Sequence, residues 1–151
     1  MAEGKSPVIE ELKTAYRMEL ETVMNYIANS INLDGVRAEE IKKSLAADIT
    51  AELGHAQLLA KRIKTVGGQV PGSLAMKWDQ KSLQPPADQT DVVAVIKGVI
   101  EAEEGAIEQY NKLIQLCDGK DYVTQDLCIP LLGDEEEHRR EFLGFLKEYT
   151  K

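Results

Sequence analysis

Two short motifs in the sequence combine a carboxylate with an imidazole at the spacing of about one helical turn. Each motif reads Glu-x-x-His: Glu52 is followed by His55, and Glu135 is followed by His138. Residues three apart lie on the same face of a helix, so each pair can bind one metal ion. A single motif would say little because Glu is common, but these two motifs use both histidines of the chain. The pattern therefore favours a metal site over solvated acidic faces that carry incidental histidines.

The same residue types recur at nearly the same spacing in the two halves of the chain. Glu19 precedes Tyr26 by seven residues, and Glu103 precedes Tyr110 by seven residues. The next Glu-x-x-His motif begins 26 residues after Tyr26 and 25 residues after Tyr110. The chain thus contains an internal repeat, in which each half supplies two Glu, one His and one Tyr.

Four Glu and two His are the ligand set of di-iron and di-manganese carboxylate bundles. Four carboxylates balance the charge of two divalent cations, and hard oxygen ligands with some imidazole suit iron or manganese. Without metal, four buried carboxylates would repel one another or hold protons. We therefore expect two metal ions per chain, with iron favoured and manganese possible. The candidate ligands are Glu19, Glu52, His55, Glu103, Glu135 and His138.

Three acids in the second half compete for one ligand position. Glu103 shares its helix face with the apolar Val99 and with Tyr110, whereas Glu101 shares its face with Lys97. Glu104 is intermediate. We therefore prefer Glu103 as the ligand, and Glu101 and Glu104 stay open as alternatives.

The elements that must position these residues are helices. Apolar residues recur at three- and four-residue spacing, which is typical of amphipathic helices, and alternating strands are hard to find. The first helix begins at Pro7, after the cap residue Ser6, and ends before Asp34-Gly35. The others are predicted over residues 36–66, 91–116 and 121–149.

The three connections differ in length, and this predicts the topology. Short turns join the first helix to the second and the third to the fourth, so each pair forms an antiparallel hairpin. Residues 68–90 lie between the hairpins and include several prolines. An extended segment of this length reaches roughly 75 Å, whereas a helix of 30 residues is about 45 Å long. The second and third helices can therefore lie parallel, in an all-α four-helix bundle of ferritin-like topology.

A linker between two small domains is the alternative, but neither hairpin could bury a core alone. We expect one domain over residues 1–151.

Composition excludes several classes of protein. The hydrophobic fraction of 43% is enough for one sizeable core. The net charge of −8 disfavours general binding to nucleic acid or to an anionic membrane surface. The sequence has no run of 18 apolar residues and no apolar leader after Met1, so we expect a cytoplasmic protein.

With these motifs the sequence resembles the ferritin-like superfamily, and the bacterioferritins in particular, over essentially its whole length. The resemblance implies a ferroxidase centre in each subunit that oxidises Fe(II) with O2 or H2O2. It also implies a homo-oligomeric cage that stores or detoxifies iron. By the same resemblance, Tyr26 matches a tyrosine adjacent to the metal ligands. The residues that carry it are Glu19 with Tyr26, Glu52-x-x-His55, Glu103 and Asp134-Glu135-x-x-His138.

The sequence also departs from the bacterioferritin pattern. Leu53 stands where bacterioferritins have a haem-ligating methionine, so haem is not expected. No short fifth helix follows residue 149, which is more similar to archaeal-type Dps-like proteins with a bacterioferritin-like centre. Those proteins usually carry a cysteine near the third-helix ligands, where this chain has Gly105.

Two other functions stay open. A rubrerythrin-like di-iron peroxidase or oxidoreductase would keep its metals and store none, although the Cys-x-x-Cys tail of a full rubrerythrin is absent. A helical interaction module would bind no metal.

Four residues outside the motifs carry structural expectations. Cys117 and Cys128 flank the last turn and are expected to be buried thiols, with a reversible disulfide as the alternative. Pro130 falls inside the fourth helix and is expected to kink or unwind it. Trp78 is expected to anchor the crossover to the bundle.

Overall fold

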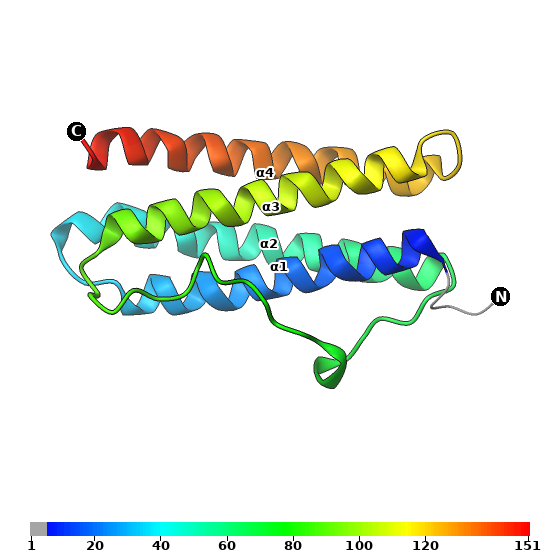
Figure 1. The fold of residues 1–151 in the computed structure, drawn as a ribbon, viewed down its shortest axis with the longest axis horizontal. Coiled ribbons are helices and arrows are strands. Elements are labelled where there is room, and N and C mark those ends of the chain that lie inside the picture. The colour runs from blue at the N-terminus through cyan, green and yellow to red at the C-terminus, as the bar shows by residue number, and fades with distance from the viewer. Residues whose placement is uncertain (1–5) are drawn as a thin grey trace.

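The computed structural model describes residues 6–151 and contains, within that range, four long helices and no strand. The helices run side by side in one elongated bundle (Figure 1). Two short 3-10 turns, Val36–Ala38 and Ser73–Ala75, precede α2 and interrupt the crossover. The all-α prediction is confirmed, and the second helix begins three residues later than predicted because its first turn is 3-10. The helices are α1 (Pro7–Asn32), α2 (Glu39–Thr65), α3 (Val92–Cys117) and α4 (Tyr122–Tyr149).

The bundle consists of two antiparallel hairpins, α1 with α2 and α3 with α4. The segment between α2 and α3 returns along the length of the bundle, so that these two helices run parallel (Figure 1). This long crossover confirms the predicted topology of a ferritin-like four-helix bundle.

Side-chain caps fix where three of the helices begin. Ser6, Asp91 and Asp121 each accept a hydrogen bond from the backbone N–H three residues further on. Such caps satisfy N–H groups that have no partner within the helix. Gly119 adopts a φ of 72° in the tight α3–α4 turn, a conformation that favours glycine.

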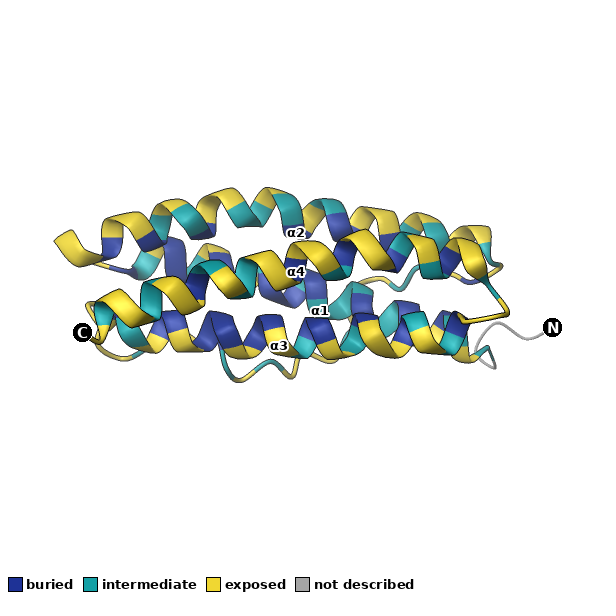
Figure 2. Ribbon diagram, turned by 90° about the horizontal axis from the view of Figure 1, so that it is seen from above, coloured by how far each residue is buried: buried dark blue, intermediate teal, exposed yellow. Residues whose placement is uncertain are grey.

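The apolar core forms two clusters, and the polar layer lies between them. The first cluster includes Leu45 of α2 and Phe142 of α4, whereas the second includes Leu59 of α2 and Leu131 of α4. On each helix the candidate metal ligands fall between the residues that enter the first cluster and those that enter the second. Figure 2 shows buried and exposed residues alternating along the visible helices, as amphipathic helices require. Both ends of the bundle are therefore packed with apolar side chains that hold the middle layer in place.

The crossover is held by residues other than the one expected. Trp78 is 46% exposed, so its prediction as the hydrophobic anchor is wrong. Leu83 is buried instead, and its carbonyl oxygen accepts a hydrogen bond from Asn29 Nδ2 at 2.8 Å. Close packing adds to this, because a Cβ atom on Gly98 would lie 2.3 Å from the carbonyl oxygen of Ser82. Only glycine at this position lets the crossover approach α3 so closely.

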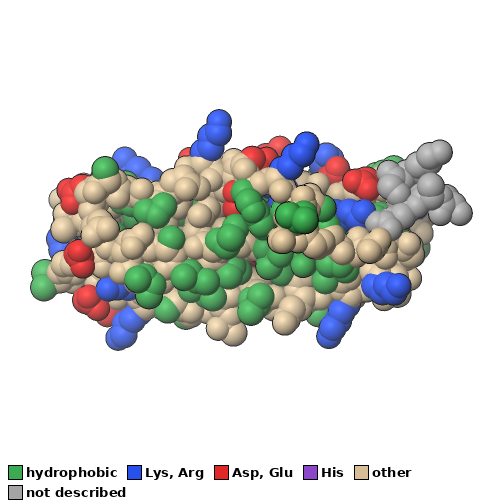
Figure 3. All heavy atoms as spheres, turned by 90° about the horizontal axis from the view of Figure 1, so that it is seen from below, with side chains coloured by type: hydrophobic (Ala, Val, Ile, Leu, Met, Phe, Trp, Pro, Cys, Tyr) green, Lys and Arg blue, Asp and Glu red, His purple; other side chains and the backbone are tan. Residues whose placement is uncertain are grey.

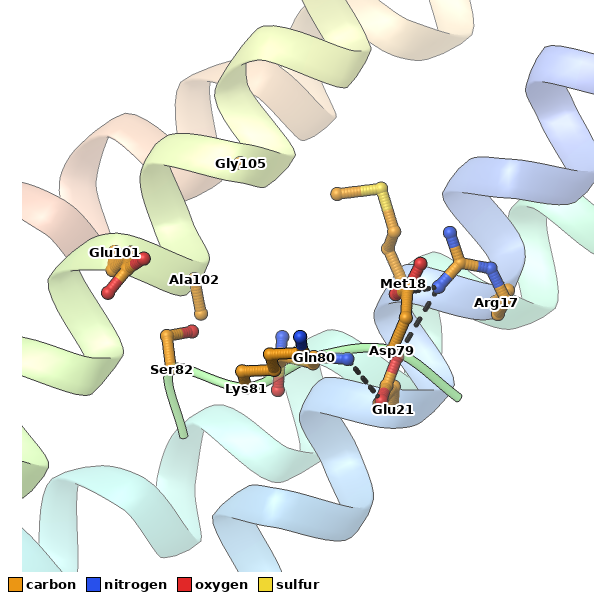
Figure 4. A pocket seen from close by; sticks show the side chains of 10 residues that line it. All are labelled: Arg17, Met18, Glu21, Asp79, Gln80, Lys81, Ser82, Glu101, Ala102 and Gly105. Atoms are coloured by element: carbon orange, nitrogen blue, oxygen red, sulfur yellow. Dashed lines mark hydrogen bonds and ion pairs between the residues drawn. The ribbon is translucent and has the colours of Figure 1, made fainter. Parts of the chain in front are cut away.

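A polar cluster on α1 also ties down the crossover. Arg17 binds Asp79 at 2.7 Å, and the backbone N–H of Gln80 donates to Glu21 at 2.6 Å (Figure 4). Glu21 is buried as a result, although it faces away from the other buried acids of the bundle.

Pro130 does not interrupt α4, which is helical from Tyr122 to Tyr149. The expectation of local unwinding is therefore wrong, and the alternative of a kink stays a prediction. Pro130 lies on the exposed side of the helix, as does Asp126, whose carbonyl loses its N–H partner. Water can bond that carbonyl, so the helix continues. Cys117 and Cys128 are buried free thiols, as expected.

Candidate metal centre

All six candidate ligands converge in the middle of the bundle. Glu19 comes from α1 and Glu103 from α3, while α2 and α4 each contribute their Glu-x-x-His pair. The four carboxylates are at most 2% exposed. His55 is also buried, and His138 lies at the edge with partial exposure. The repeat predicted from the sequence thus brings both halves to one place.

The six residues divide into two overlapping groups. The first contains Glu19, Glu52, His55 and Glu135, and the second contains Glu52, Glu103, Glu135 and His138. Within each group, one ligand atom from every residue lies within 4.8 Å of the others. Glu52 and Glu135 belong to both groups. The two groups of candidate ligands therefore lie side by side and share two carboxylates.

Both imidazoles present Nδ1 to the carboxylates. Nδ1 of His55 lies 2.9 Å from Oε1 of Glu135, and Nδ1 of His138 lies 3.1 Å from Oε1 of Glu52. Each histidine thus contacts the shared glutamate of the opposite hairpin. In both halves, Nδ1 is the nitrogen that can coordinate an ion.

The centre contains several buried polar atoms that have no hydrogen-bond partner. Buried polar groups in proteins are normally bonded, so a concentration of unsatisfied atoms calls for an explanation. One cation in each group would satisfy these atoms, and the donor set of carboxylate oxygens and imidazole nitrogens fits iron or manganese. The atoms are Glu19 Oε2, Glu52 Oε1, His55 Nδ1, Glu103 Oε2, both carboxylate oxygens of Glu135 and His138 Nδ1.

Two tyrosines cross between the hairpins. Tyr110 of α3 donates to Oε1 of Glu19 at 2.8 Å, and Tyr26 of α1 donates to Oε1 of Glu103. A seven-residue spacing places each tyrosine about two turns from the glutamate of its own helix, so each reaches the glutamate of the other hairpin. In both glutamates Oε1 is engaged by the phenol and Oε2 is left without a partner.

The charges of the metal-free centre are balanced by protons. Burial, and then the charge of Glu19, raises the pKa of Glu52 and of Glu135. Burial disfavours the charged form of His55, but the neighbouring carboxylates of Glu19, Glu52 and Asp134 together outweigh it and raise the pKa of His55 to about 9. Burial also opposes ionisation of Glu103, yet the neighbouring Glu135, His138 and Tyr26 together lower its pKa. A cation entering this centre would displace protons.

The competing acids of α3 lie elsewhere. Glu101 and Glu104 are exposed, whereas Glu103 is 1% exposed. Glu103, which shares its helix face with apolar residues, is therefore the one of the three acids that lies in the centre.

Two further acids contact the histidines and were not recognised from the sequence as partners. Nε2 of His55 lies 2.9 Å from Asp134, and Nε2 of His138 lies 3.5 Å from Asp48. Asp134 appeared only as part of the second motif. The spacing of Asp48, four residues before Glu52, placed it on the ligand face and could have revealed it.

A separate pocket of about 420 Å³ opens between α1, α3 and the crossover. Its lining includes Met18, Glu101 and Gly105, and none of the candidate ligands contributes to it (Figure 4).

Among the described residues, no helix is both long and apolar enough to cross a membrane.

Comparison with known proteins agrees with the geometry. The chain is 26% identical over 137 residues to the "DNA protection during starvation protein" of Pyrococcus furiosus, covering 89% of this chain and 74% of that protein. It is 27% identical over 135 residues to the bacterioferritin of Desulfovibrio desulfuricans, covering 89% and 71%. A solved dodecameric thioferritin, the bacterioferritin-related protein of Bacteroides fragilis, superimposes with a TM-score of 0.84 at 25% identity, covering 95% and 86%. Residues 9–151 match the family described as the ferritin-like domain, and the chain therefore belongs to that family.

Proposed function

We propose that residues 1–151 form one di-iron domain that binds two iron ions per chain and oxidises Fe(II) with O2 or H2O2. The activity is that of a ferroxidase in iron storage or detoxification. One observation carries the proposal: two four-residue groups share Glu52 and Glu135, which are buried and have unsatisfied oxygens. Relatives named bacterioferritin and "DNA protection during starvation protein" support it.

Each residue has a distinct role in the proposed centre. Glu19 and His55 bind one ion, and Glu103 and His138 bind the other. Glu52 and Glu135 bridge the two, since they alone belong to both groups. Four carboxylates then neutralise two divalent ions, which removes the repulsion present without metal.

The tyrosines fix the two terminal carboxylates. Because each phenol holds Oε1, the Oε2 atoms of Glu19 and Glu103 are directed to the ions. Bound iron supplies one electron per Fe(II), so a pair can reduce O2 to peroxide or peroxide to water. The side chains keep the pair together in a buried layer, and the protons they release on binding iron are available to the reduced oxidant.

Storage requires a container, so we propose that the chain forms a closed homo-oligomer. Exposed apolar side chains gather on the face over α1 and the crossover, shown in Figure 3. Met24, Ile27 and Ile31 share one face of α1 and are between 44% and 74% exposed. Large exposed apolar patches are typical of protein–protein contacts.

The proposal is tested by measuring iron binding and oxidation on the same sample. Titration of Fe(II) without oxygen should saturate at about two ions per chain, as the two groups require, and a parallel Mn(II) titration tests the choice of metal. Addition of O2 or H2O2 should then produce a rapid rise in ferric absorbance.

Further Fe(II) added in air should enter a soluble mineral inside an assembly much larger than a dimer. Uptake that stops at about two ions per chain would contradict storage. A chain that binds no Fe(II) would contradict the proposed activity itself.

A further inference from the structure

The two histidines of the centre have the same orientation but different outer partners. Each presents Nδ1 to the glutamates and Nε2 to an aspartate outside the ligand set. Nε2 of His55 lies 2.9 Å from Oδ2 of Asp134, and Nε2 of His138 lies 3.5 Å from Oδ1 of Asp48. A carboxylate opposite Nε2 favours the tautomer with a proton on Nε2, which leaves the Nδ1 lone pair free for a metal ion.

These aspartates do not occupy equivalent positions in the repeat. Asp134 directly precedes Glu135, and the corresponding position before Glu52 is Ala51. The first half lacks a carboxylate there, and Asp48 lies about one helical turn earlier on the same helix. The contact to the imidazole is therefore kept by a different residue, from a position that the internal symmetry does not predict.

The surroundings of the two aspartates also differ. The side chain of Asp134 is 58% exposed, whereas that of Asp48 is 13% exposed. In Asp48, Oδ2 is buried without a hydrogen-bond partner. An exposed carboxylate interacts mainly with water, whereas a shielded one acts more strongly on its neighbour because the local dielectric constant is lower.

Given the metal centre proposed above, we propose that Asp48 is a positioning residue for His138. It orients the ring, fixes the proton on Nε2 and thereby sets the affinity of the half-site formed by Glu103 and His138. The separation of 3.5 Å exceeds the usual N–H···O distance of about 2.9 Å. The proposed role therefore requires a small rotation of either side chain that shortens this separation when an ion binds.

Anaerobic binding of Co(II) tests this role, because its visible spectrum reports the ligands of each ion without any turnover. Wild-type protein should bind two Co(II) ions per chain. In Asp48→Ala, the affinity of one ion should fall by roughly 10- to 100-fold, with a change in that ion's absorption bands. The other ion should keep its affinity. In Asp48→Asn, the affinity of the affected ion should lie between those of the wild type and Asp48→Ala, since the amide oxygen still accepts a hydrogen bond but carries no charge.

Three variants serve as controls and as a rescue. Glu39→Ala removes an exposed acid from the same helix and should leave both ions unchanged. Asp134→Ala should weaken the other ion, and by a smaller factor, because Asp134 is hydrated. Addition of Ala51→Asp to Asp48→Ala puts the carboxylate where the second half of the repeat has it, and should restore the lost affinity.

Several results would overturn the proposal. One is wild-type affinity and spectrum in Asp48→Ala; another is equal weakening of both ions, which would indicate general loss of structure. If Asp48→Ala fails to fold, wild-type binding by Asp48→Asn would overturn it instead. Wild-type protein that binds no Co(II) and no Fe(II) would refute the metal centre itself, and that failure is distinct from a failure of Asp48 alone.

Discussion

The middle of the bundle and its two ends are buried to a similar degree but have opposite chemistry. At the ends, residues such as Leu45 and Leu113 are fully buried among other apolar side chains. In the middle, four glutamates and two histidines meet, and several of their atoms have no hydrogen-bond partner. Apolar burial stabilises the fold, whereas a buried cluster of carboxylates lowers stability until a cation neutralises it. The apolar burial at the two ends therefore offsets the free-energy cost of burying the carboxylates in the middle layer.

The largest expected effect is on oxidation by variants of the shared glutamates. Glu52→Ala and Glu135→Ala each remove a ligand from both ions, so fast Fe(II) oxidation should fall by more than about 100-fold, since contacts one step further out already contribute 10- to 100-fold. Stopped-flow absorbance after mixing with O2 or H2O2 measures this rate. Glu101→Ala is the matched control, because Glu101 is exposed on α3, and it should oxidise Fe(II) at the wild-type rate. If both bridging variants retain fast oxidation, the middle layer is not the oxidation site.

Next in size is the effect of removing an apolar side chain from one end. Leu45→Ala should lower the free energy of unfolding by about 2–5 kcal/mol, because it leaves a cavity in a packed cluster. Chemical denaturation of the metal-free protein measures the change. The same substitution at Leu74, which is fully exposed, should change stability little. Folded Leu45→Ala protein should still bind two Fe(II) ions per chain in the cold, and loss of that stoichiometry would show that ends and middle are not separable.

A smaller effect is expected from pH on the metal-free protein. The pKa of His55 is raised to about 9, so its protonated form stabilises the folded state fully below pH 6.5, and this contribution is lost as the pH rises toward 9. The raised pKa values of Glu52 and Glu135 act in the same direction, since the folded state prefers their protonated forms. Thermal unfolding of metal-free protein should therefore occur at a lower temperature at pH 9 than at pH 6.5. A melting temperature that rises over this interval would contradict the conclusion that protons balance the charges of the metal-free centre.

The sequence predicted the parts of this structure in which residue types recur at a regular spacing. Helical spacing identified the four helices, and the faces shared with apolar residues separated Glu103 from Glu101. The repeat of Glu, Tyr and Glu-x-x-His was enough to bring the two halves together, because each motif lies on one face of its helix.

What the sequence did not predict depends on contacts between elements. The crossover has no period, so nothing distinguished Leu83, which is buried, from the larger Trp78, which is half exposed. Asp48 contacts a histidine on another helix, His138. The internal repeat predicts that partner at position 51, where the chain has alanine. The exposure of Pro130 depends on the packing of α4 against the other helices, and on the exposed side water can bond the carbonyl of Asp126.

The central claim is that two iron ions lie side by side in the middle layer, bridged by Glu52 and Glu135. Crystals loaded with Fe(II) without oxygen, with anomalous diffraction recorded at the iron absorption edge, test it most directly. We expect two anomalous peaks per chain, one bound by Glu19 and His55 and the other by Glu103 and His138, with both shared glutamates between them. A single peak, or peaks only at other sites, would contradict the account.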